Sequence, residues 1–540
     1  MSALQNDQQA APLDQAMRTR FRTVLDRNAV VEAGAGTGKT TLVVERILAL
    51  VLGRDIGERG AAYPSGGLPV LAAPIPIERI VAITFTDLAA AELGARVRDR
   101  LTETLGNARE CGDSVVTDLL VVALADLPRA SISTIHSFCT KLLREYALDA
   151  GLDPGFETLD AVGKSALVEE VFETWFEEIG NRPEVRRVLS FGMSLEKVEE
   201  HARGLMELEQ PRQAPPSDEN EARLPLRGKG GVIERFLLDM QIEANYFRGL
   251  IESGVDLPDD GLRMFYRSIS AVVAEHAALV GSDASSKDWD AFELEIMQPV
   301  WAKGSPPGPR LQGAKWKKAM GEGETSDYKD RHDEQKGSVL EIRRAIGADL
   351  VSGIEPSLLE FRKHYQDEKE RLAKLDFEDL LASAEQLVRN HPVVRAALIR
   401  RYSTIFVDEF QDTSPVQASF VFFLAGGQAS VNERDWRRVQ PAPGRLVLVG
   451  DPKQSIYRFR SADVEIYKAC CDLVCEADPE AMLQISTNFR SDGPLVDWIN
   501  EVFHSESARM EAPQNGEGYQ ADYIDLIPWH KERGSASPVL

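Results

Sequence analysis

A glycine-rich turn near the N-terminus constrains the fold more than any other feature of this sequence. Residues 28–41 read NAVVEAGAGTGKTT and precede the apolar-periodic segment LVVERILALVL. A β-branched run, a glycine-rich turn and a helix together form the context in which backbone N–H groups hold phosphates. The alternative is an incidental turn. The residues predicted to bind nucleotide are Ala33, Gly34, Ala35, Gly36, Thr37, Gly38, Lys39, Thr40 and Thr41.

Two of these residues have specific predicted roles. Lys39 is expected to contact the β- and γ-phosphates, and Thr40 is expected to bind Mg²⁺. The strict pattern has glycine where this chain has Ala33. Three glycines remain in the turn, so the loop keeps the conformational freedom that it needs.

Further strand patterns cover residues 79–85, 130–135, 404–407 and 445–450, and helical patterns alternate with them. Alternation of this kind predicts an α/β fold, with a doubly wound parallel sheet covered on both faces. Thr84, Phe85 and Thr86 fall at the C-terminal edge of a strand, where such sheets bind ligands.

Residues 151–374 differ from the rest, because strand signals fade and charged helical segments dominate. This stretch is predicted to be a helical insertion. Residues 301–318 read as a loop rich in helix breakers, and the basic cluster KWKK at 315–318 lies in it. That cluster is interpreted as a solvated loop, with a nucleic-acid contact as the alternative.

Two adjacent carboxylates, Asp408 and Glu409, follow the strand at 404–407. We expect this strand to pair beside the strand of the phosphate loop. One carboxylate can then hold Mg²⁺ while its neighbour acts as general base toward water. Read alone, such a pair is usually a solvent-exposed surface feature.

Aromatic and basic residues gather in two later segments. In LVLVGDPKQSIYRFR, Gln454 is followed by Tyr457, Phe459 and Arg460, a plausible platform for single-stranded nucleic acid. The alternative places the two aromatic residues in the core of a half-buried strand. In QISTNFRS at 484–491, an aromatic ring able to stack on adenine stands beside an arginine able to neutralise a transferring phosphoryl group.

Composition limits the classes of function. Sixty-two Lys and Arg against 86 Asp and Glu give a net charge of −24, which argues against nucleic-acid binding by bulk charge but permits a local groove. No apolar run approaches the roughly 20 residues that span a bilayer. The N-terminus lacks the pattern of a signal peptide, so a cytoplasmic location is expected. Five cysteines suit reduced thiols.

Seven motifs, taken in order, resemble those of UvrD/RecB-type superfamily 1 DNA helicases, and the wording GDPKQSIYRFR is closer to the RecB and AddA branch. They are AGAGTGKT, TFTDLAAAEL, TIHSFC, LDFEDLL, VDEFQDTSPVQ, VGDPKQSIYRFR and STNFRS. The resemblance implies a P-loop NTPase that uses ATP and Mg²⁺ to move 3′ to 5′ on single-stranded DNA in repair or recombination. Its implied substrates are single-stranded DNA or duplex–single-strand junctions. It implies no association with a membrane.

The resemblance also implies a domain plan. Residues 1–150 and 375–479 form a first RecA-like motor domain, 151–374 a helical insertion domain, and 480–540 the start of an incomplete second RecA-like lobe. Nothing after residue 505 resembles the later motor motifs.

Residue roles carry over by position. The implied catalytic residues are Lys39, Asp408 as a metal contact with Thr40, Glu409 as the base, Gln454 as a γ-phosphate sensor, and Arg490. Phe489 is implied to stack on adenine. The implied DNA-binding residues are Thr84, Phe85, Thr86, His136, Ser137, Tyr457, Phe459 and Arg460.

The chain departs from the family pattern at Asp87, Ser414 and Ser461, and Gln15 lies further from Lys39 than the adenine-reading glutamine of the family. Three alternatives to an autonomous motor remain. The chain is a nucleotide- and DNA-binding module that needs a missing second motor half, a second protein subunit completes its cleft, or it is a P-loop kinase or GTPase.

Overall fold

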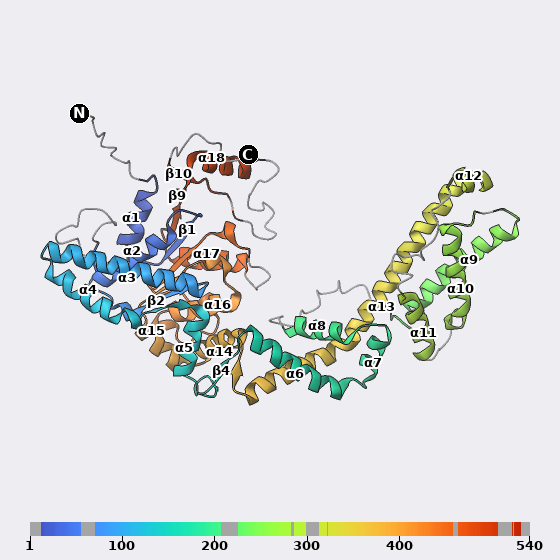
Figure 1. The fold of residues 1–540 in the computed structure, drawn as a ribbon, viewed down its shortest axis with the longest axis horizontal. Helices are drawn as coiled ribbons and strands as arrows, with labels where there is room; N and C mark the ends of the chain where they lie inside the picture. Colours follow the sequence, from blue (N-terminus) through green and yellow to red (C-terminus); the bar gives the residue numbers. More distant parts are fainter. Residues whose placement is uncertain are drawn as a thin grey trace. The chain divides into compact units, whose positions relative to one another are not determined.

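The computed structural model describes residues 12–55, 71–206, 225–256, 258–281, 286–298, 313–320, 322–456, 463–505, 521 and 523–530. The chain divides into two compact units (Figure 1). We call residues 1–159 with 373–540 the α/β unit, and residues 160–372 the helical unit.

The centre of the α/β unit is a six-stranded sheet in which all neighbouring strands are parallel. Its order is β3-β2-β6-β7-β1-β8. The strands are β1 (Ala29–Ala33), β2 (Ile80–Thr84), β3 (Ser131–Thr134), β6 (Thr404–Val407), β7 (Leu446–Gly450) and β8 (Met482–Ile485). The predicted doubly wound α/β fold is confirmed.

Strand order corrects one prediction from the sequence. The strand that precedes the acidic pair, β6, does not lie beside β1, because β7 pairs with both of them. A second difference concerns β8, because the sequence predicts that residues 480–540 begin a second lobe. In the structure β8 pairs with β1, with Leu483 opposite Val31, and forms an edge of the first sheet.

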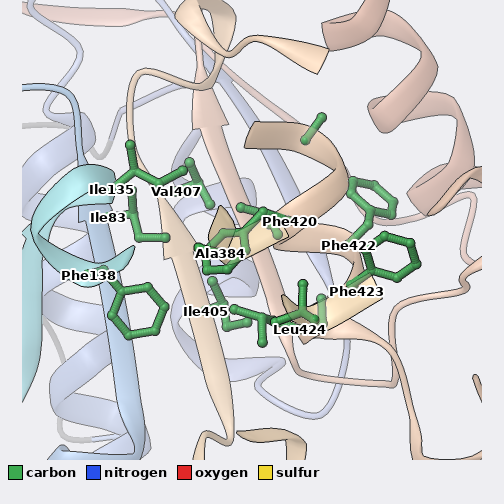
Figure 2. Packing of buried hydrophobic residues seen from close by; sticks show 14 of the residues in the cluster. Ile83, Ile135, Phe138, Ala384, Ile405, Val407, Phe420, Phe422, Phe423 and Leu424 are labelled. Carbon is green, nitrogen blue, oxygen red and sulfur yellow. The ribbon is translucent and has the colours of Figure 1, made fainter. Parts of the chain in front are cut away.

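Successive side chains of each strand alternate between two hydrophobic cores, as the pleat of a strand requires. In β2, Val81 and Ile83 belong to one core, whereas Ile80 and Ala82 belong to the other. Figure 2 shows part of the first core, where Ile83 lies among aliphatic and aromatic side chains from several elements. Both faces of the sheet are therefore buried.

Ten α-helices cover the α/β unit in the described residues. Several begin at a capping side chain: Thr86 accepts from Ala89 N–H at the start of α3, and Asp376 forms a capping box at α14. The helices are α1 (Gln15–Thr23), α2 (Lys39–Leu52), α3 (Asp87–Glu110), α4 (Ser114–Asp126), α5 (Ile135–Glu145), α14 (Phe377–Asn390), α15 (Pro392–Arg401), α16 (Pro415–Ala425), α17 (Val464–Ala477) and α18 (Gly493–His504).

Two small parallel sheets complete the strands of the described residues. In one, β4 (Glu157–Thr158) pairs with β5 (Lys374–Leu375), and in the other β9 (Thr487–Asp492) pairs with β10 (Ile527–His530). Short 3-10 turns occupy Ile77–Arg79, Leu127–Arg129, Ala277–Leu279, Phe410–Asp412, Gln428–Ser430, Trp436–Arg438 and Pro452–Gln454.

The helical unit is organised along α13 (Glu322–Arg371), which at 50 residues is roughly 75 Å long. Trp175 of α6 packs against Phe361 of α13, with ring centroids 5.1 Å apart. The other helices are α6 (Ala161–Ile179), α7 (Pro183–Ser190), α8 (Leu195–Met206), α9 (Val232–Glu252), α10 (Gly261–Glu275), α11 (Ser286–Met297) and α12 (Gly313–Met320) (Figure 1).

Helix α12 corrects the interpretation of residues 301–318 as a loop. Residues 313–320 are helical, because the prolines of the segment end at Pro309 and AKWKKAM consists mostly of good helix formers. None of the helices in the described ranges has both the length and the apolar character needed to cross a membrane.

Candidate functional site

The phosphate loop joins the carboxyl end of β1 to the first turn of α2. Gly36 and Gly38 have φ values of +75° and +85°, a left-handed backbone that favours glycine. A Cβ on Gly36 would lie 2.8 Å from the Cβ of Arg490, so a larger residue has no room there. The Thr37 hydroxyl donates to the Gly34 carbonyl at 2.7 Å. The first N–H groups of α2 have no partner within the helix and can bind phosphate oxygens.

Lys39, the first residue of α2, faces the acidic pair that follows β6. Its Nζ atom lies 3.2 Å from Oε2 of Glu409, and Gln411 donates to the same oxygen from Nε2 at 2.8 Å. Although β7 separates β1 from β6, the loops at the carboxyl edge bring these side chains together. Glu409 has a φ of +53°, a costly conformation for a non-glycine residue of the kind that clusters at functional sites.

Asp408 is held at the end of β6 by its backbone N–H, which donates to the Ile83 carbonyl at 2.9 Å. Burial and the charge of Glu409 raise the pKa of Asp408 to about 6, and Lys39 opposes the shift. The same causes raise the pKa of Asp412 to about 6. Carboxylates that crowd together in this way favour a nearby cation.

The donor set fits Mg²⁺, which prefers hard oxygen ligands and retains several waters. Asp408 supplies a carboxylate that burial has partly deprived of water. Thr40 stands in the first turn of α2, and its hydroxyl makes no hydrogen bond with any other described residue. These two residues can hold the ion between the phosphate loop and the acidic pair.

Gln454, at the end of a 3-10 turn after β7, is held by Asp451. Its Nε2 donates to Oδ2 of Asp451 at 2.7 Å, and Lys453 forms an ion pair with Oδ1 at 2.8 Å. The backbone N–H of Asp451 in turn donates to Oε1 of Gln411 at 2.9 Å. Gln411 thus connects the ends of β6 and β7 through one buried amide.

The motif STNFRS begins one residue before β9 and contacts the phosphate loop directly. Asn488 donates from Nδ2 to the Ala35 carbonyl, and the Phe489 N–H donates to the Gly36 carbonyl, each at 2.9 Å. Arg490 is exposed, and its guanidinium makes no hydrogen bond or ion pair with any residue that the structure describes. A cationic group is therefore available beside the phosphate loop.

The N-terminal end of α1 also reaches this loop. Arg18 holds Asp14 through two contacts, of 2.8 Å and 3.1 Å, and donates from Nη2 to the Thr37 carbonyl at 3.0 Å. Asp14 accepts the backbone N–H groups of Ser486 and Thr487, both at 2.9 Å. Burial alone would raise the pKa of Asp14, but the hydrogen bonds from Arg18 and Thr487 outweigh it and lower the pKa below its ordinary value.

We predict that Asp14→Asn lowers the free energy of unfolding by about 3 kcal/mol at neutral pH, because it leaves Arg18 buried without a countercharge. A carboxyl whose pKa is lower in the folded state stabilises the fold above its unfolded pKa, and the contribution disappears as pH falls through the folded pKa. The gap between wild type and variant should therefore narrow below about pH 4. Urea unfolding followed by circular dichroism across this pH range measures the gap, with exposed Asp118→Asn as control. A gap independent of pH would contradict the prediction.

A second set of predicted residues lies at the carboxyl ends of β2 and β3. Thr86 caps α3, and the Thr84 hydroxyl donates to the Thr86 carbonyl at 3.1 Å. Ser137 contacts the hydroxyl of Thr134 at 2.9 Å. These three predicted residues thus carry structural hydrogen bonds, whereas Phe85 is partly exposed beside them.

His136, in the first turn of α5, packs edge to face against Phe377, with ring centroids 5.3 Å apart. Burial lowers the pKa of His136 although Asp87 opposes the shift, which favours the neutral imidazole. Phe377 starts α14 and leaves 52% of its surface exposed. Tyr457, Phe459 and Arg460 lie outside the described residues.

Several residues of the site were not predicted. Gln411 and Phe377 lie inside two motifs of the family resemblance, DEFQD and LDFEDLL. Their position within these motifs could have indicated that they belong to the site. Asn488 directly precedes the predicted Phe489. Asp14 and Arg18 had no usable signal, because an Asp and an Arg four residues apart are common on exposed helices.

The model of the UvrD/REP helicase N-terminal domain matches residues 13–472. The chain is also similar to proteins from three bacteria that are named as subunits of an ATP-dependent helicase/nuclease. That of Desulforamulus reducens is 26% identical over 89% of this chain and 38% of its own length. Those of Levilactobacillus brevis and Desulforudis audaxviator are 27% and 28% identical over 88% and 91% of this chain, and 37% and 39% of their own lengths.

The chain thus spans about two fifths of the length of these curated relatives. The family match covers most of the chain, from α1 through most of α17, and includes the phosphate loop and the acidic pair. The predicted resemblance is confirmed: the chain belongs to the UvrD/REP helicase N-terminal domain family.

Proposed function

We propose that the chain is the ATP-driven motor of a DNA helicase, which moves 3′ to 5′ along single-stranded DNA in repair or recombination. The 3.2 Å contact between Lys39 and Glu409 is the observation that carries the proposal. A phosphate-loop lysine opposite an acidic pair suits transfer of a phosphoryl group from a nucleotide to water. The relatives' name, which includes an ATP-dependent helicase, supports this function over a kinase or GTPase.

ATP binding would exchange one partner of Lys39 for another. In the structure, Nζ of Lys39 pairs with Glu409. In our proposal, the β- and γ-phosphates replace Glu409 as the partners of Nζ. Glu409 then becomes free to orient a water molecule. Thr40 and Asp408 would hold Mg²⁺, which neutralises phosphate charge when bound. Asp408, whose pKa burial raises, would have to be ionised to serve as a ligand.

Hydrolysis would then use Glu409 as the general base. As the water oxygen forms a bond to the γ-phosphorus, Glu409 accepts the water proton. The bond between the γ-phosphorus and the β–γ bridging oxygen breaks, and the products are ADP and phosphate. Arg490 would neutralise charge on the γ-phosphoryl group, Gln454 would respond to its presence after leaving Asp451, and Phe489 would stack on adenine.

Single-stranded DNA would lie along the carboxyl ends of β2 and β3. Phe85, His136 and Phe377 offer aromatic rings on which bases can stack, at about 1–3 kcal/mol per base. Stacking suits a chain with a net charge of −24, which cannot rely on bulk attraction to phosphates. Tyr457, Phe459 and Arg460 would extend this aromatic strip, and the exposed residues Thr86 and Ser137 would contact the DNA backbone. Thr84 is buried, so it would act indirectly, through the hydrogen bond from its hydroxyl to the Thr86 carbonyl.

We further propose that residues 1–150 and 375–479 form the first motor domain, together with β8 as an added edge strand, and that 151–374 form an insertion domain. Residues from β9 onward would begin the second lobe. Because the relatives are named as subunits, we propose that the partner of this chain is a second protein subunit. We also propose a cytoplasmic location.

ATP turnover by the 540-residue chain, with and without single-stranded DNA, tests the function. We expect DNA to stimulate turnover. If nucleotide and DNA bind without turnover, the chain is a binding module that requires a second motor half or a partner chain. If single-stranded DNA fails to bind even at low salt, the helicase proposal is wrong, and a P-loop kinase or GTPase becomes the better hypothesis.

Phe377→Ala is expected to weaken single-stranded DNA binding about tenfold, because it removes one exposed stacking surface. Turnover without DNA should stay unchanged. Fluorescence anisotropy with a labelled oligothymidylate measures the affinity. Val393→Ala, which truncates an 81% exposed side chain on α15, serves as the control. Equal DNA affinity in wild type and the Phe377 variant would remove Phe377 from the proposed strip.

A further inference from the structure

The ion pair between Asp14 and Arg18 is unusually buried for a pair at the first turns of a helix. The two residues leave only 7% and 6% of their surface exposed. Removing two charges from water is costly, and packed apolar residues could replace such a pair without loss of stability. Breaking the pair costs stability, but replacing both residues need not, so stability alone does not explain why two charges are buried here.

The pair joins three parts of the α/β unit that are distant in sequence. From α1, Arg18 reaches the phosphate loop at the Thr37 carbonyl, 3.0 Å away. Asp14 accepts hydrogen bonds from Ser486 and from both the backbone and the hydroxyl of Thr487, each at 2.9 Å. Thr487 opens β9, whose next two residues are bonded to the phosphate loop themselves.

One edge of the Arg18 guanidinium remains unused. Nε and Nη2 make all the hydrogen bonds of this side chain in the described residues, and none of them uses Nη1. Nη1 lies 3.9 Å from the position that a Cβ on Gly38 would take, at the residue that caps the N-terminus of α2. The guanidinium carbon lies 4.9 Å from the centre of the Phe489 ring. The free donor is thus fixed in direction, beside the end of α2 where phosphates bind.

We propose that Arg18 binds the nucleoside triphosphate through Nη1, and that Asp14 positions Arg18 and connects the bound nucleotide to β9. The inference rests on the proposed function, since it assumes that the phosphate loop binds ATP. Asp14 is a positioning residue in this scheme, because it acts through Arg18. Through this connection, the position of β9, and with it the position of Arg490, would depend on whether a nucleotide is bound.

Arg18→Lys tests the contact. Lysine keeps the charge beside Asp14 but has no planar fork, so it cannot hold both carboxylate oxygens and also reach the nucleotide. We expect affinity for Mg-ATP to fall about tenfold, as loss of a charged hydrogen bond predicts. Arg22→Lys is the matched control, because Arg22 lies one turn further along α1 and pairs with Asp55 at 2.7 Å, away from the phosphate loop. This control should bind Mg-ATP as wild type does.

Calorimetry with Mg-ATP, Mg-GTP and inorganic triphosphate locates the contact. Equal loss for all three assigns Nη1 to a phosphate, whereas loss for the nucleotides alone assigns it to the base or ribose. Normal ATP binding by the Arg18 variant, or equal weakening by the Arg22 control, would overturn the inference alone. A wild-type chain that binds no Mg-ATP would overturn the proposed function as well.

Asp14→Asn tests the connection to β9. Trp529 of β10 lies 5.4 Å from the Phe489 ring between centroids and reports on β9. The ATP-induced fluorescence change of Trp529, taken as the difference from a Trp529→Phe chain, should shrink at least about threefold in the Asp14 variant at saturating ATP. A full Trp529 response in the folded Asp14 variant would refute the connection, since a purely structural role leaves the response intact.

Discussion

Lys39→Ala should reduce ATP turnover by about 10²- to 10³-fold, the range found when one preorganised donor to developing charge is removed. Nζ of Lys39 is the cation that faces Glu409, and the charge of Lys39 opposes the raised pKa values of Asp408 and Asp412. Its removal leaves three carboxylates without this countercharge at the place where the γ-phosphate is expected. Mg-ATP affinity should fall together with the rate.

Steady-state turnover with saturating single-stranded DNA, together with calorimetric titration of Mg-ATP, separates the effects on rate and affinity. Lys468→Ala removes an exposed lysine of α17 and serves as the matched control. Turnover by the Lys39 variant within about twofold of wild type would show that the phosphate loop is not the catalytic nucleotide site.

Glu409→Gln should leave Mg-ATP bound but lower the rate of hydrolysis by about 10²- to 10⁴-fold, the usual contribution of a general base. Glutamine preserves the size of the side chain and can still accept the hydrogen bond from Gln411, but it cannot take a proton from water. The variant also loses the ion pair with Lys39, which frees Nζ for the phosphates. ATP affinity should therefore be equal to that of wild type or higher.

Single-turnover hydrolysis measured by rapid quench, alongside equilibrium ATP binding, gives both quantities. Glu465→Gln, on the exposed first turn of α17, controls for the loss of one negative charge. A Glu409 variant that hydrolyses ATP at the wild-type rate would require a different base. Loss of ATP binding would instead assign Glu409 a role in shaping the site.

Local patterns were sufficient to predict the phosphate loop with the strand before it, and four further strands of the sheet. The glycines of the loop are required by backbone conformation, and β-branched runs between helical patterns mark buried parallel strands. The proposed roles of Phe489 on adenine and Arg490 on the γ-phosphate stay predictions. The structure brings both residues to the phosphate loop, as these roles require.

Patterns were insufficient wherever the answer depended on distant pairing. The sequence pattern predicts β6 beside β1, whereas β7 lies between them. It also predicts that β8 belongs to a second lobe, whereas β8 pairs with β1. A strand's periodicity records that both of its faces are buried, but not which strand is its neighbour. The same limit hid Asp14 and Arg18, whose partners lie as far away as Thr487.

The sequence by itself determined the chemistry of this protein: a loop that can hold phosphates, a lysine, an acidic pair and a family membership, all carried by residues close together along the chain. Only the tertiary structure decided which of these groups meet. Lys39 and Glu409 are 370 positions apart, yet their side chains are 3.2 Å apart, because parallel strands place all their carboxyl ends at one edge of the sheet. Spacing along a chain encodes local geometry, whereas contacts across a sheet depend on the packing of the whole α/β unit.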